Sequence, residues 1–396
     1  MKHAGLSLYP RQPLWFLLRA SALVVIGTIF FLLVTGKKIF GLSGLELFWV
    51  VLMPIAVLMM YFAPLLWRNV CPLSTVSLWH WSLFGRRRLE REGMSARILT
   101  GWRAEAHAFL TKNGLIVSAV LFWIIVPLRI PFFNSEAQAT LWLLALVFLA
   151  AAVFGSLFPV KSGWCTSICP VAAVEKVYGM NPAVRVKNTR CHYRNKETAA
   201  VASCSGCSFN CGDVVEPEHA YWQAEKGGLF HDTINAEMRK VFIGSFPGFI
   251  LAFYLYASKI LVLPDGPVID VLVLYMTFAA FMGISALIYL LTKRRLRAGA
   301  ERREGSMTPG TVSLSYAVSK RRLDMVFLTV AINVIAGFAF NSIVGKVLPK
   351  WFALTPETGT AILASLIAVF FLASLYSLRN AWNEGPMPGQ YRPSWW

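Results

Sequence analysis

Residues 138–159 read QATLWLLALVFLAAAVFGSLFP, and residues 160–170 continue as VKSGWCTSICP. The first stretch has no charged residue and exceeds the roughly 20 apolar residues that a helix needs to cross a bilayer. The second leaves that span through Trp164 and places Cys165, Cys169 and Pro170 directly beyond it. The apolar run therefore indicates a membrane protein, and the cysteine motif at its end is the first candidate for a functional site.

Seven more apolar runs are long enough to span a membrane, near residues 15–35, 46–66, 114–131, 241–262, 268–292, 324–346 and 360–378. The first is too long, and lacks the small-residue cleavage site, for a removable signal peptide. The whole chain is 56% hydrophobic and only 15% charged, whereas soluble domains are about 25% charged. We predict an all-α, polytopic membrane helix bundle of about eight transmembrane helices.

The charged residues are strongly biased towards Lys and Arg, 38 against 20 Asp and Glu, for a net charge of +18. They cluster in segments 67–113 and 293–323, between apolar runs, while the loops near 36–45, 132–137, 263–267 and 347–359 carry few. This is the positive-inside pattern of membrane proteins rather than the basic surface of a nucleic-acid binder. It predicts a multi-pass protein of a bacterial inner membrane, in contact with lipid, with both termini cytoplasmic.

The chain divides into a four-span half (1–159), a cytoplasmic cysteine-rich segment (160–240) and a second four-span half (241–396) with the basic loop 293–323. Within the first half, Cys71-Pro72 also follows a span, so the unit of two spans, Cys-Pro and a short apolar segment occurs twice, in 15–85 and 114–179. Proline at the start and glycine after the end predict that each apolar segment, Leu73–Phe84 and Val171–Tyr178, is a short helix. We expect both helices to lie at the membrane surface; chance similarity between two membrane exits is the alternative.

Six of the seven cysteines fall in the 160–240 segment, and all seven lie on the predicted cytoplasmic side, where thiols stay reduced. Metal or cluster ligation is then the expected use of close-set cysteines. Four soft thiolates that converge on one point are what a 4Fe–4S cluster requires. The candidates are Cys71, Cys165, Cys169, Cys191, Cys204, Cys207 and Cys211.

The spacing of the cysteines suggests which of them bind the same cluster. Cys204, Cys207 and Cys211 can bind one corner of a cluster, with Cys169 as the fourth ligand. Cys165 and Cys169 share a helix face if the exit of the span stays helical. Cys165 and Cys191 are then spare or belong to a second cluster, which would need Cys71 and a non-cysteine ligand such as His192 or His80. Zinc is the rival metal for the same residues.

The Cys165-x3-Cys169-Pro170 motif resembles that of the membrane-bound 4Fe–4S polyferredoxin-like family. This family includes the quinol-dehydrogenase membrane subunit of periplasmic nitrate reduction and the nitrous-oxide respiration regulator. The resemblance covers about residues 50–215 and implies transfer of electrons between a quinone pool or a cytoplasmic donor and a partner redox enzyme, as in a quinol dehydrogenase or an electron-transfer subunit of an oxidoreductase. The chain departs from the family pattern in three ways: Trp67 stands where the second motif copy has Cys165, the usual ferredoxin cysteine run is absent, and the last four spans are extra.

Other cofactors and activities find less support. No apolar run contains a histidine and no Cys-x2-Cys-His occurs, so we expect no haem. Asn333 and Asn341 could bond a quinone carbonyl or form interhelical hydrogen bonds. A transporter would need charged residues inside the spans, and the sequence shows almost none. We therefore expect an integral membrane iron–sulfur electron-transfer protein; the alternative is a zinc-binding membrane scaffold, assembly factor or sensor without redox activity.

Overall fold

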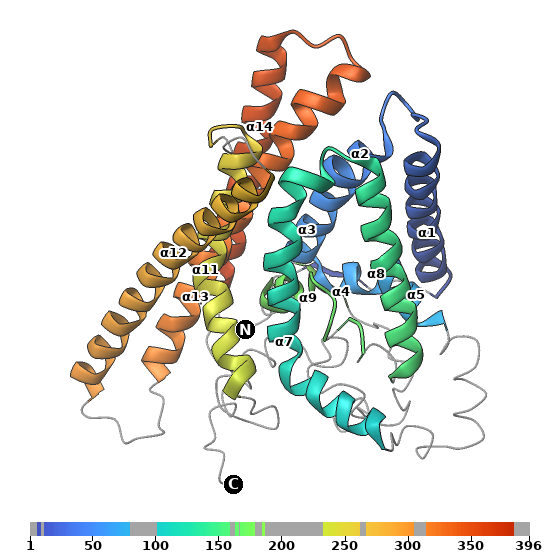
Figure 1. Cartoon of the computed structure of the whole chain (residues 1–396). Coiled ribbons are helices and arrows are strands. Elements are labelled where there is room, and N and C mark those ends of the chain that lie inside the picture. Colours follow the sequence, from blue (N-terminus) through green and yellow to red (C-terminus); the bar gives the residue numbers. More distant parts are fainter. Residues whose placement is uncertain are drawn as a thin grey trace.

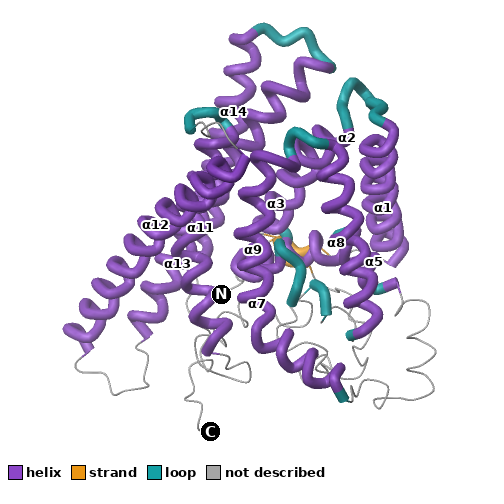
Figure 2. Tube along the Cα trace, viewed as in Figure 1, coloured by secondary structure: helices purple, strands orange, loops and turns teal. Residues whose placement is uncertain are grey.

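A computed structural model of the chain describes residues 6–8, 12–79, 101–158, 163–165, 167–178, 184–186, 233–261, 267–304 and 314–383. The described part is a bundle of helices, apart from one short parallel ladder between β1 (Leu6–Leu8) and β2 (Val184–Val186) (Figures 1 and 2). Eight of its helical segments are long and apolar enough to cross a membrane. The predicted all-α, eight-span architecture is confirmed.

The first half contains four of these segments. The first is α1 (Gln12–Thr35). The second runs through α2 (Gly44–Glu46), the π-helical η1 (Leu47–Leu52) and α3 (Met53–Phe62). The third joins α7 (Trp102–Leu128) to η4 (Arg129–Phe133), and the fourth is α8 (Ala137–Leu157).

The second half supplies the other four. They are α11 (Thr233–Ala257), α12 (Pro267–Glu304), α13 (Leu314–Ser342) and α14 (Pro356–Asn383). Two short segments, η6 (Ile343–Val347) and η7 (Leu348–Lys350), extend α13. Large side chains on α12 such as Leu272, Ile284 and Leu287 are more than half exposed, as expected for a helix whose solvent is lipid.

Three short helices connect the spans near the cysteines: α4 (Pro64–Val70), α5 (Pro72–Ser77) and α9 (Ala172–Tyr178). Pro64 and Pro72 each open a helix, where the missing N–H costs nothing because the first turn has no partner for it. The same prolines prevent α3, α4 and α5 from merging into one rod.

The largest apolar core joins the two halves, with buried side chains from α3, α7, α9, α11, α12 and α13. Phenylalanines of α11 form its centre: Phe242, Phe246 and Phe249 all pack their rings against Phe122 of α7, at centroid distances of 5.1–6.0 Å. A smaller core packs α1 and η1 against α8. A third surrounds Trp164, Cys165 and Cys169.

A half-buried arginine, Arg129, also joins the halves, at the C-terminal end of α7. The Arg129 guanidinium donates to the Trp49 carbonyl (2.9 Å) and to Asn134 Oδ1 (2.7 Å). It lies over the rings of Trp49 and Phe253, 4.4 and 5.3 Å from their centroids. These contacts explain how a span can end in a partly buried cation.

The two short helices after the Cys-Pro turns pack among other helices, while their position at the membrane surface stays a prediction. The helix α9 matches the expected segment, but Ala172, Ala173 and Val177 are fully buried, and α9 lies inside the bundle rather than on its surface (Figure 1). In α5, Ser74 and Ser77 are buried in the same way. The physical reason is composition: α5 carries no charge and α9 only Glu175 and Lys176, so neither has the charged face of an interfacial helix.

Candidate metal centre

The two Cys-Pro turns lie side by side in the fold. Cys71 ends α4 and begins α5, and its N–H donates to the Trp67 carbonyl at 2.7 Å. Its thiol is close enough to that of Cys165 for their charges to interact, and the Cys169 thiol is within the same reach of both. The repeat predicts that Cys71 and Cys169 hold equivalent positions, each at the start of a short helix; Cys71 lies directly before α5, and Cys169 lies three residues before the first residue of α9.

A tight turn, not a helix, presents Cys165 and Cys169. The N–H groups of Ser167, Ile168 and Cys169 all point to one acceptor, the Trp164 carbonyl, at 3.0–3.2 Å. The exit of the span therefore does not remain helical through both cysteines, so the condition under which they would share a helix face is not met. The sequence held the reason, because Phe158 precedes Pro159 and adopts the extended backbone (φ −120°, ψ 156°) that a following proline favours.

All three thiols are withdrawn from water. Cys71, Cys165 and Cys169 are 7–8% exposed, and the Cys165 Sγ lies 3.7 Å from the Ser77 Oγ of α5. Burial raises the pKa of the Cys71 thiol to about 12, and the nearby Cys165 thiol and Glu175 carboxylate act in the same direction. Burial likewise raises the pKa of Cys169 well above its usual range, again with help from its cysteine neighbours.

These thiols therefore stay protonated unless a cation replaces the protons, which is how metal binding couples to thiol ionisation. Soft, buried and mutually close sulfurs are the donor chemistry that an iron–sulfur cluster requires. Within the described residues, however, no three Cys, His, Asp or Glu side chains form a group able to hold a metal ion. The predicted ligands Cys191, Cys204, Cys207 and Cys211, and the candidates His80 and His192, lie outside the described residues.

A serine of the third span holds the Cys169 turn in place. Ser118 of α7 is fully buried, and its Oγ donates to the Cys169 carbonyl at 2.7 Å and accepts from the Ala173 N–H at 2.8 Å. One hydroxyl thus fixes the turn and the start of α9 together. No sequence pattern marked Ser118, since it lies 51 residues from Cys169 in an apolar run.

Replacing Ser118 with alanine is expected to destabilise the protein by about 1–3 kcal/mol, because the buried Ala173 N–H loses its acceptor. The Ser156→Ala variant is the control, since within the described part of the chain the Ser156 hydroxyl bonds only the Ala152 carbonyl of its own helix turn. Thermal unfolding of both variants in one detergent measures the difference. Equal melting temperatures for the two variants would show that the Ser118 bridge contributes nothing.

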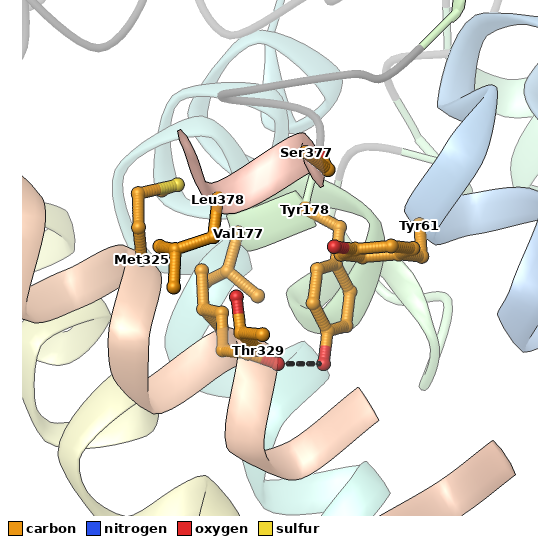
Figure 3. Close-up of a pocket in the computed structure, with 8 residues that line it drawn as sticks. Tyr61, Val177, Tyr178, Met325, Thr329, Ser377 and Leu378 are labelled. Atoms are coloured by element: carbon orange, nitrogen blue, oxygen red, sulfur yellow. Dashed lines mark hydrogen bonds between the residues drawn. The ribbon is translucent and has the colours of Figure 1, made fainter. Parts of the chain in front are cut away.

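A second polar site lies between the halves, next to the cysteine turns. Tyr61 of α3 and Tyr178 of α9 meet edge to face, with ring centroids 5.4 Å apart. The Tyr178 hydroxyl donates to the Leu328 carbonyl at 3.1 Å (Figure 3). Tyr61 lines the same cavity as Thr329 and Ser377. The cavity that these residues enclose measures about 10 Å³, which is the space of one water molecule and too small for a quinone ring.

Asn333 has a structural role. Its side-chain N–H groups donate to the Thr329 carbonyl and to Ser374 Oγ of α14, both at 2.8 Å. This is the interhelical bond weighed against quinone binding, and it agrees with Asn333 packing α13 on α14. Asn341, by contrast, is exposed.

Charged residues inside the seventh span were missed by the sequence analysis. Asp324 is 1% exposed and accepts a hydrogen bond of 2.6 Å from the Tyr289 hydroxyl of α12, while Lys320 Nζ lies 4.0 Å from its other oxygen. The available signal was the spacing of four between Lys320 and Asp324, which places opposite charges on one helix face.

The Asp324→Asn variant is expected to lose about 3–5 kcal/mol of folding stability, because the buried Lys320 then lacks the charge of the Asp324 carboxylate. The asparagine side chain can still accept the hydrogen bond from Tyr289, so the loss of stability measures the effect of removing the charge. Adding Lys320→Met to this variant should recover most of that stability. A double-mutant cycle by thermal unfolding checks this, and additive effects of the two changes would contradict it.

Comparisons with known proteins identify no family for this chain. No protein-family model, no curated protein and no solved structure matches the chain.

Proposed function

We propose that the chain is an integral membrane iron–sulfur electron-transfer protein that passes electrons between a quinone pool or a cytoplasmic donor and a partner redox enzyme. One observation carries the proposal: two Cys-Pro turns, about 100 residues apart in sequence, bury Cys71, Cys165 and Cys169 beside one another inside a membrane bundle. Reduced thiols with no disulfide partner among them have metal ligation as their usual purpose. The motif resemblance described above supports the same role.

In this proposal Cys169 joins Cys204, Cys207 and Cys211 as ligands of one 4Fe–4S cluster, while Cys71, Cys165 and Cys191 are available for a second. When bound, such a cluster supplies one-electron transfer at a potential set by burial and by hydrogen bonds to sulfur. The chain's own contribution is at Cys165, whose sulfur lies 3.7 Å from the Oγ of the fully buried Ser77, a hydroxyl that donates to the Ser74 carbonyl. Ser118 sets the position of Cys169 through its carbonyl.

Anaerobic purification followed by iron, sulfide and zinc analysis tests the proposal. We expect iron and sulfide in equal amounts, with the broad sulfur-to-iron absorption in the visible that zinc does not give. Stoichiometric zinc without iron would instead support the alternative, a zinc-binding scaffold, assembly factor or sensor without redox activity. Neither metal in the purified protein would reject both.

The orientation is also a proposal: a bacterial inner-membrane protein with both termini cytoplasmic, since only then do the cations of 67–113 and 293–323 lie inside. Reporter fusions after Gly85 and after Arg303 are expected to give cytoplasmic signals. A fusion in the loop 347–359 is the matched control and should report the other side. A periplasmic signal after Gly85 or Arg303 would reverse the orientation and remove the argument that the thiols are kept reduced.

A further inference from the structure

Three helices of the second half are held together in one contact layer. An added Cβ on Gly244 of α11 would come within 2.9 Å of the Tyr289 ring of α12, and the Tyr289 hydroxyl donates to Asp324 of α13 at 2.6 Å. One turn along α11, a Cβ on Gly248 would meet the main chain of Phe281 in α12. The close approach fixes the helices relative to one another, so the residues one turn away from the contact layer must meet as well.

One turn from the contact layer, each of the three helices contributes a lysine. Lys240 of α11 and Lys320 of α13 precede the layer by four residues. Lys293 follows it by four, because α12 runs in the opposite direction (Figure 1). Residues four apart share a helix face, and the Lys293 ammonium is close enough to both other lysines for their charges to interact. Three helices thus bring three positive charges together, which repel one another.

Two carboxylates lie near these lysines. Glu237 pairs with Lys240, and Asp324 lies 4.0 Å from Lys320; both acids are also within electrostatic reach of Lys293. The Glu237 side chain is 67% exposed, so water weakens its attraction for a cation. Among the described residues of this group, three cations therefore face two anions, and one positive charge is left over.

Lys293 lies at the edge between the bundle and the lipid. It is half-buried and ends the long apolar run of α12. It follows the buried Tyr289 by four residues and the 47% exposed Leu290 by three, so one side of it meets the bundle and the other side the lipid. Leu287 and Leu291 are exposed as well, and they offer apolar surface on the membrane side of the ammonium group.

A ligand for this place needs a negative head group and an apolar body. A phosphate group accepts charge-assisted hydrogen bonds from ammonium groups and offsets their repulsion, and basic pockets between transmembrane helices bind anionic lipid head groups. We propose that Lys240 and Lys293 bind the phosphate of one anionic phospholipid, whose acyl chains lie along the exposed leucines of α12. The buried Lys320 adds its charge from behind. The site does not depend on the proposed electron transfer.

Lipid binding to the full chain in an uncharged detergent tests the site. After delipidation, the protein is titrated with phosphatidylglycerol or with phosphatidylcholine of equal chain length, and native mass spectrometry counts the bound lipids. We expect one phosphatidylglycerol to bind at least about fivefold more tightly than phosphatidylcholine, the effect of one lysine near an anionic head group. Lys293→Gln should remove this preference. Arg294→Gln should keep it and is the matched control, since Arg294 is exposed at the next position of α12 and its loss removes the same charge.

Melting temperatures give a second readout. Without lipid, Lys293→Gln should melt at or above the wild-type temperature, because the substitution removes a repelling charge. Added phosphatidylglycerol should raise the melting temperature of the wild type and of Arg294→Gln, because a ligand that binds only the folded state stabilises it. It should leave that of Lys293→Gln unchanged.

Three results would overturn the proposal. Equal loss of the lipid preference in Lys293→Gln and Arg294→Gln would show general attraction to a basic surface. A lower melting temperature of Lys293→Gln without lipid would show that Lys293 makes a stabilising contact within the protein. Equal stabilisation of the wild type by inorganic phosphate and by phosphatidylglycerol would show a site for a free anion.

Discussion

Replacing Gly155 with alanine is expected to cost at least about 3 kcal/mol of stability and to lower the yield of folded protein sharply. In α8, Gly155 lies against the backbone of α5, and an added Cβ would come within 2.6 Å of the Ser77 Cα. The clash is with main chain at the end of a short helix, so no side-chain rotation relieves it. The same displacement would move Ser77 away from the Cys165 sulfur.

Gly283→Ala in α12 is the matched control. No atom lies within 4 Å of the added Cβ there, and alanine is favoured over glycine in a helix by about 1 kcal/mol. That variant should melt at or above the wild-type temperature. If Gly155→Ala melts as high as Gly283→Ala, then α5 and α8 do not pack as closely as the structure has them.

Replacing Cys169 with serine is expected to remove from the anaerobically purified protein the iron of the cluster that Cys169 is proposed to share with Cys204, Cys207 and Cys211. A serine hydroxyl has almost the same size, but it does not supply the soft thiolate that the metal requires. Metal content and visible absorption measure the loss, and Cys207→Ser should reproduce it if both residues bind one cluster.

Ser167→Ala controls for disturbance of the turn, because Ser167 is buried between Cys165 and Cys169 and carries no thiol. It should retain its iron. Full iron content in Cys169→Ser would show that this thiol is not a ligand and that Cys169 contributes only to packing.

The spans could be predicted from the sequence because their physical cause is local. The predicted third and fourth spans, 114–131 and 138–159, differ from Asn113–Phe133 and Ala137–Leu157 by one or two residues. The predicted sixth span ended at residue 292, whereas the helical segment in the structure continues to Arg302. The apolar run stops at residue 292, but arginine is a good helix former and the helix continues out of the apolar layer.

The surroundings of the cysteines could not be predicted in the same way, since they depend on contacts between distant segments. Cys71 and Cys165 were identified by type and motif, yet nothing in the sequence indicated that Ser77, Ser118 and Gly155 surround them. Ser77 acts through its contact with a sulfur, Ser118 through a hydrogen bond to a carbonyl, and Gly155 through its lack of a side chain. None of these features produces a regular spacing in the sequence. Glu175, whose charge reaches both Cys71 and Cys169, was missed for the same reason.

Burial of the three thiols constrains the order in which the cell must build the protein. Among the described residues, the sulfurs are only 7–8% exposed where α5 and α8 pack at Gly155. Under the proposed function, we therefore expect the metal to be loaded during biogenesis, before the first half has finished packing, and we expect folded protein without metal not to take it up later. Chain synthesised during iron starvation would have to be degraded and replaced, not repaired.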